Sequence, residues 1–70
     1  MIEYSEWMLP LSVEVGDSIR LKYGVCKITA MGETPEHTLF ICNDVYDIEH
    51  VWEQRDDREI EVIFMVEEKI

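Results

Sequence analysis

Apolar and polar residues alternate along residues 11–15, 18–23, 25–31 and 59–67, with the two-residue period of half-buried β-strands. Residues 2–8 are a further, irregular candidate strand, and residues 37–42 are a short apolar one. Gly16, Gly24 and Gly32 fall between these stretches, where the chain is expected to turn. The pattern predicts an all-β fold of five or six short strands.

Residues 45–53 fit two interpretations. As a strand, they place His50 and Trp52 on one face, and their β-branched and aromatic residues favour this state. As a helix, they begin after Asp44 as a cap and bury a stripe that includes Val45 and Val51. We expect a strand, with a short helix at about 45–54 as the alternative.

The dipeptide Tyr23-Gly24 is suited to a tight turn between two of the strands. A two-residue turn there pairs Leu21 with Cys26. It also brings three bases to the outer face of one hairpin, where they form either an anion site or a solvated face: Arg20, Lys22 and Lys27.

Residues 13–19 read Val-Glu-Val-Gly-Asp-Ser-Ile and lead into the hairpin around Tyr23-Gly24 and on to residues 27–31, Lys-Ile-Thr-Ala-Met. An apolar-x-apolar-Gly-Asp-x-apolar stretch before a long hairpin resembles the opening of Src-homology-3-like small barrels and of KOW-type modules. The resemblance covers about a quarter of the chain and implies a fold, while no function follows from it. We therefore expect residues 1–70 to form a single domain, a small bent sheet or barrel of the Src-homology-3-like kind.

The candidate strand at residues 59–67 has two different faces. Its alternation buries Ile60, Val62, Phe64 and Val66, and it turns to the other side Glu59, Glu61, Ile63, Met65 and Glu67. An exposed Ile63–Met65 pair beside carboxylates has the apolar centre and polar rim of a protein interface. In the alternative interpretation, both residues pack under the N-terminal segment around Trp7 and Met8.

The charge of the chain is strongly negative and uneven. Sixteen acids and six bases give a net charge of −10, of which residues 33–70 carry −9. Direct binding to nucleic acid depends on Lys and Arg, and anionic membrane surfaces attract bases, so neither is an expected partner. An acidic half of this density is a candidate functional face.

The residues that commonly carry catalysis or hold metals are too dispersed to form a site. Cys26 and Cys42 are sixteen residues apart, and His37 and His50 are thirteen apart, whereas zinc ligands come in pairs two to five residues apart. Apolar neighbours make both thiols inert. We expect no catalytic residue, no metal, no cofactor and no enzyme activity. Two cysteines without a signal peptide or membrane span predict a cytoplasmic protein with reduced thiols.

Two functions remain. In the first, the chain is an acidic interaction protein that docks on a basic, nucleic-acid-binding surface of a partner protein, as an inhibitor of the phage or mobile-element type would. In the second, it is a structural or regulatory assembly module that uses an apolar strand face, and its acids serve solubility. We also expect weak homodimer formation through the last strand. The predicted partner-binding residues are Glu49, Glu53, Asp56, Asp57, Glu59, Glu61, Ile63, Met65 and Glu67.

Overall fold

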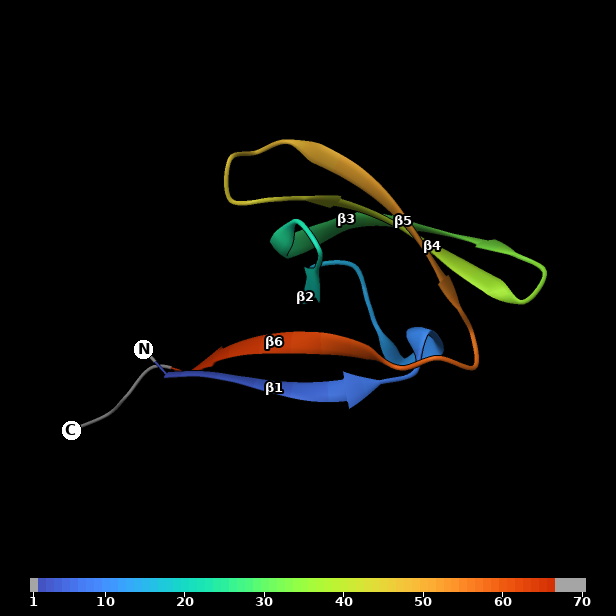
Figure 1. The fold of residues 1–70 in the computed structure, drawn as a ribbon, viewed down its shortest axis with the longest axis horizontal. Helices are drawn as coiled ribbons and strands as arrows, with labels where there is room; N and C mark the ends of the chain where they lie inside the picture. The colour runs from blue at the N-terminus through green and yellow to red at the C-terminus, as the bar shows by residue number, and fades with distance from the viewer. Residues whose placement is uncertain (1, 67–70) are drawn as a thin grey trace.

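The computed structural model describes residues 2–66, which form one antiparallel sheet of six strands in the order β1-β6-β2-β3-β4-β5 (Figure 1). The strands are β1 (Ile2–Met8), β2 (Ser18–Leu21), β3 (Gly24–Thr34), β4 (His37–Asn43), β5 (Glu49–Arg55) and β6 (Ile60–Val66). The sheet bends over itself without closing, so β1 and β5 are its two edge strands. The expected all-β fold class is confirmed, as a bent sheet and not as a closed barrel.

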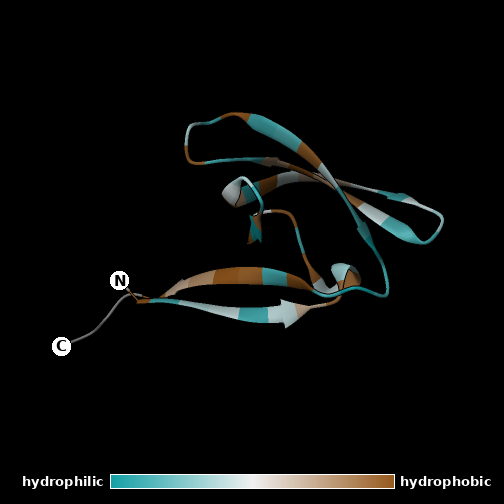
Figure 2. Ribbon diagram, viewed as in Figure 1, coloured by the Kyte–Doolittle hydropathy of each residue, from teal (hydrophilic) through white to brown (hydrophobic). Residues whose placement is uncertain are grey.

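The core lies inside the bend and is built by alternate residues of the strands. Ile19, Ile28, Phe40 and Val62 are each exposed by 1% or less. Figure 2 shows the apolar run of β6 beside the largely polar β1. Because successive side chains of a strand point to opposite faces, the same strands turn a second set of residues outward, and that set holds the candidate site.

Residues 11–15 do not form the expected strand. The chain forms the short 3-10 helix η1 (Pro10–Ser12) and then an extended link, in which Val13 is buried and the apolar residues two positions to either side are exposed. Pro10 fixes φ at the first helical position. The Asp17 carboxylate accepts a hydrogen bond from a backbone N–H three residues earlier, at 2.9 Å, which closes a local turn. The alternation over these residues is therefore not that of a strand.

The first hairpin turns one residue earlier than expected, at Lys22-Tyr23. Gly24, with φ of 101°, already belongs to β3 and lies opposite Leu21, so Cys26 does not face Leu21. The pairing differs from the expected one by two residues. A shift of two keeps every side chain on its expected face, and the core is unaffected.

The strand interpretation of residues 45–53 is confirmed from Glu49 onward, and the helix interpretation is wrong. β4 and β5 pair from His37–Arg55 to Asn43–Glu49, and residues 44–48 form the loop between them. The loop expected at residues 32–36 is also shorter than expected, because β3 continues to Thr34.

Candidate functional site

The residues predicted to bind a partner come from three parts of the chain, and two of them, Glu53 and Glu59, line one hollow. They fall into a pair on β5, a group in the following turn and a row on β6. Three strands separate β5 from β6 across the sheet, so the acids of the two strands have different neighbours. Glu67 lies outside the described residues.

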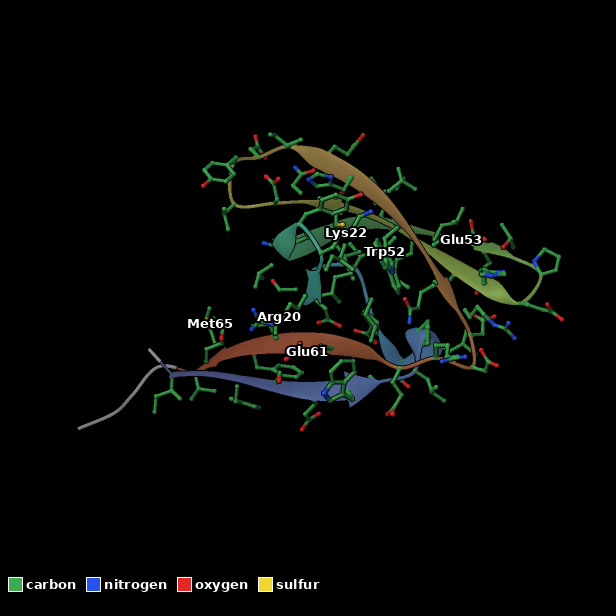
Figure 3. The ribbon with its side chains drawn as sticks, viewed as in Figure 1. Arg20, Lys22, Trp52, Glu53, Glu61 and Met65 are labelled. Carbon is green, nitrogen blue, oxygen red and sulfur yellow. The ribbon has the colours of Figure 1, made fainter. Side chains whose placement is uncertain are left out.

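The acid of β6 is neutralised by a base from β2. Arg20 donates from Nε to Oε1 of Glu61 at 3.1 Å and from Nη2 to Oε2 of Glu3 at 3.2 Å (Figure 3). The side chain of Glu61 is only 19% exposed. One guanidinium thus holds two carboxylates, and this group, the Arg20 cluster (Glu3, Arg20 and Glu61), offers a partner less negative charge than the sequence suggests.

Ile63 is buried, so the predicted exposed Ile63–Met65 pair is wrong for this residue. Ile63 is 5% exposed and lies opposite Ser5 of β1 and Ser18 of β2. β6 runs between these two strands and is not an edge strand, which explains the burial. Met65, nearer the end of β6, is 58% exposed and remains available for contact.

The acids of the turn between β5 and β6 have mixed roles. Asp56 accepts a hydrogen bond from the hydroxyl of buried Thr38 at 2.7 Å, so it holds the turn against β4. Asp57 accepts two hydrogen bonds from Arg55, at 3.1 and 3.2 Å. Glu59 is exposed and lies in a shallow hollow of about 640 Å³ whose lining mixes acids, bases and one tryptophan: Trp7, Glu53, Gln54, Arg55, Arg58 and Glu59.

The acids of β5, unlike Glu61, have no Lys or Arg bound to them within residues 2–66. Glu49 and Glu53 lie on the outer face of the sheet to either side of Val51, which is 63% exposed. Residues 37–54, named here the acidic hairpin, contain four Asp or Glu and no Lys or Arg. Within residues 2–66, no Lys or Arg forms an ion pair with these acids, although Arg55 and Arg58 line the same hollow as Glu53. The Nδ1 atom of His37 lies 3.6 Å from Oε1 of Glu53.

Asp44 organises the loop at the tip of the acidic hairpin. Its Oδ1 accepts hydrogen bonds from the backbone N–H groups of Tyr46 at 2.8 Å and Ile48 at 3.1 Å, and its Oδ2 accepts one from Nε2 of His50 at 2.8 Å. The bond from His50 is the main cause that holds the pKa of Asp44 below its ordinary value of 3.8, and the Ile48 N–H is the next. Asp47 sits at φ of 63° and accepts from the Asn43 side chain, which completes a fixed loop.

This fixed loop presents apolar side chains to solvent. Tyr46 is 81% exposed, and Val45 and Ile48 are exposed as well. The sequence pattern predicts a strand from residue 45, with Asp44 as a helix cap in the alternative, and neither interpretation indicates this exposed loop. An Asp whose carboxylate can bond the N–H two residues on also begins tight loops, and that signal could have located the tip.

The three bases predicted on the first hairpin have different neighbours. Arg20 belongs to the Arg20 cluster, Lys27 lies opposite Ser18 of β2, and the Lys22 ammonium lies 5.2 Å from the ring centre of Tyr23 in the turn. Tyr23 in turn stacks on His50 of β5 with ring centres 4.1 Å apart. Lys22 therefore contacts the aromatic group that anchors the turn to the acidic hairpin.

The two cysteines are free and buried in the core. Burial raises the pKa of the Cys42 thiol to about 11, and the neighbouring Cys26 adds to the shift. Burial likewise raises the pKa of Cys26. A raised pKa keeps both thiols in the neutral form at neutral pH, which disfavours nucleophilic attack by either.

Comparison of the chain with protein-family models, with curated proteins and with solved structures finds no match in any of the three. The resemblance to Src-homology-3-like barrels therefore stays an expectation from the sequence. Residues 2–66 include no helix with the length and apolar character to cross a membrane. The function has to be argued from the acidic hairpin itself.

Proposed function

We propose that this chain is a non-enzymatic interaction protein that docks on a basic surface of a partner protein through the acidic hairpin. The observation that carries the proposal is the contrast in charge pairing. Within the described residues, Arg20 binds Glu3 and Glu61, and Arg55 binds Asp57 in the turn after β5, while the acids of residues 37–54 have no Lys or Arg partner. Unpaired, exposed carboxylates keep their field for a partner and steer its approach.

The exposed apolar residues of the hairpin supply the second part of an interface. Val51 lies between two carboxylates, and Tyr46 stands at the tip beside Asp44 and Asp47. Apolar contacts with a charged rim suit a partner surface that has an apolar depression ringed by Lys and Arg. Such basic surfaces are typical of proteins that bind nucleic acid, so the carboxylates would occupy the places of phosphates. The function would then be inhibition, of the kind that small phage or mobile-element proteins perform.

A pair of matched charge reversals tests the proposal. Glu49→Lys/Glu53→Lys changes the acidic hairpin, and Glu6→Lys/Glu14→Lys makes the same change in net charge on exposed residues elsewhere. A partner is first captured from a native lysate. Its association rate with the immobilised, dilute protein is then measured at several salt concentrations. The hairpin variant should slow association about tenfold and flatten its salt dependence, whereas the control should change both much less. Equal effects of the two variants would contradict docking through the hairpin, and failure of duplex DNA to displace the partner would contradict phosphate mimicry.

A second candidate function rests on the end of the β1–β6 pair where Ile2 lies opposite Val66. Ile2, Tyr4 and Val66 are exposed there on one face of the two strands, whereas Met65, also exposed, lies opposite Glu3 on the other face. An assembly module that binds a larger complex through this apolar end should hold its partner at high salt, because burial of apolar surface is not screened. Tyr4→Lys should then release the partner, and neither Met65→Lys, on the other face of the pair, nor the hairpin reversals should.

A further inference from the structure

β5 is an edge strand whose backbone groups are open on one side. It pairs with β4 and with no other strand of the described chain. Backbone hydrogen bonds just beyond its two ends, from Asp44 N to Ile48 O and from Asp56 N to Glu36 O, fix the alternation of the ladder. By that alternation, the residues whose N–H and C=O groups point away from β4 are Glu49, Val51, Glu53 and Arg55.

We propose that two copies of this chain associate by pairing their β5 strands antiparallel, about a two-fold axis at Trp52. In this register, Glu49 of each copy lies opposite Arg55 of the other, and Val51 lies opposite Glu53. All these residues are on the outer face of the sheet. Arg55 already binds Asp57 through Nε and Nη2, and its Nη1 is not used in that pair, so it can meet Glu49 of the second copy without losing Asp57.

Charge selects this register over its neighbours. An axis at Val51 would place Glu49 opposite Glu53 of the other copy. An axis at Glu53 would place the two Glu53 carboxylates, one from each copy, opposite each other. Like charges directly opposite one another destabilise a strand pair, and opposite charges stabilise it. The axis at Trp52 also pairs each of the four β5 residues that point away from β4 with a β5 residue of the other copy. Either neighbouring register leaves one of the four without such a partner.

The other edge strand, β1, and the strand that the sequence predicts to self-associate, β6, are poorer candidates. β1 carries two acids, Glu3 and Glu6, and no base, so no self-pairing of β1 brings opposite charges together. β6 has β1 on one side and β2 on the other, which removes the open edge on which its predicted self-association depended. Of the strands with an open edge, β5 alone is complementary to itself in charge.

The association is expected to be weak. Each copy carries a net charge of −10, and Glu53 of one copy lies diagonally across from Glu53 of the other, so repulsion opposes the backbone hydrogen bonds. Added salt screens the long-range repulsion more than the close pairs, so it should strengthen the dimer. Sedimentation velocity over protein concentrations up to about 1 mM at moderate salt is therefore the appropriate measurement.

Charge exchange between Glu49 and Arg55 is the decisive test. Glu49→Arg lowers the net negative charge, which by itself favours association, yet it places two arginines opposite each other and should raise the dimer dissociation constant about tenfold. Glu6→Arg, with the same change in net charge on β1, should not raise it. The double variant Glu49→Arg/Arg55→Glu has the wild-type net charge and should restore the wild-type dissociation constant.

A second variant tests the open edge itself. Proline at an edge position whose N–H faces solvent leaves the ladder to the neighbouring strand intact. Val51→Pro should therefore keep the far-ultraviolet circular dichroism of the wild type and abolish the dimer. Three results would overturn the proposal: a wild-type protein that is monomeric at about 1 mM, a dimer that survives Val51→Pro, and a double variant that does not recover the wild-type dissociation constant. A monomeric wild type would mean that this edge is open to a strand of another protein.

Discussion

The β1–β6 pair and the acidic hairpin stand toward opposite edges of one sheet, and both carry carboxylates on the outer face. In the first region, Arg20 lies between Glu3 and Glu61 and binds both. In the second, Glu49 and Glu53 flank Val51 with no arginine or lysine bound to either within residues 2–66. The difference shows that the value of an acid to a partner depends on where the sheet places the bases, and not on the number of acids.

The outer apolar residues differ between the two regions in the same way. Ile63 is covered where β6 runs between β1 and β2, while Val51 on the edge strand is open. The β1–β6 region therefore uses its outer face to hold the sheet together. The hairpin leaves its outer face free for another molecule.

The largest effect on stability should appear when Ile63→Ala is compared with Val51→Ala. Ile63→Ala removes buried apolar contacts and should lower the free energy of unfolding by about 2–4 kcal/mol. Val51→Ala, at an exposed site, should change it by less than about 1 kcal/mol. Urea denaturation of dilute protein measures both. Similar losses for the two variants would show that the outer faces of the two regions are not different in kind.

The fold was predictable where the local pattern and the packing agree. β4 carries a short apolar run, and β6 begins with the alternation Ile60-Glu61-Val62; their β-branched and aromatic residues favour strands, as Val51 and Trp52 do in β5. Residues 11–15 alternate too, but Pro10 and the turn at Asp17 act within the same few residues and redirect the chain. A short alternating stretch therefore predicts a strand only when neither end already specifies another conformation.

A smaller effect is expected at the tip of the hairpin, where Asp44→Asn is compared with Asp47→Asn. At pH 7, Asp44→Asn should lower stability more, because Asp44 accepts three hydrogen bonds, two of them from the Tyr46 and Ile48 N–H groups, and Asp47 accepts one side-chain bond. The loop of the first variant should also lose protection from amide hydrogen exchange. An equal effect of the two substitutions would mean that Asp44 does not organise the loop.

The same carboxylate makes this region sensitive to acid. The folded-state pKa of Asp44 lies below 3.8, so the charged form stabilises the fold above that pH, and the contribution is lost as the pH falls through the folded-state pKa. The difference in stability between the wild type and Asp44→Asn should therefore shrink below about pH 4. Urea denaturation at pH 7, 5 and 3 measures it, and a difference that stays constant down to pH 3 would be contrary to this assignment.

The division of the acids between paired and unpaired was not predictable from the sequence. Glu61 and its partner Arg20 are 41 residues apart, and they meet because β2 lies beside β6 in the sheet. Glu49, like Glu61, has an apolar residue two positions further along its strand, but no Lys or Arg of another strand binds it within residues 2–66. The local sequence pattern predicts which face of the sheet a side chain lies on. The order of the strands decides which other charges lie beside it on that face.

The smallest effect is expected when the Arg20 cluster is opened, which would make the two regions alike. Arg20→Ala should lower the free energy of unfolding by about 0.5–1 kcal/mol, because Arg20 and Glu3 are exposed, Glu61 is partly exposed, and ion pairs open to solvent contribute little. Arg20→Met keeps an apolar stem over β6 and removes the charge, so it separates packing from electrostatics. If electrostatics dominates, both variants lose stability equally in low salt, and both approach the wild type in about 1 M salt, where such pairs are screened. If the alanine variant alone is destabilised, and salt does not change the difference, the Arg20 stem covers Ile63 and the charge pairing is incidental. In that case, the contrast between the two regions would rest on packing and not on charge.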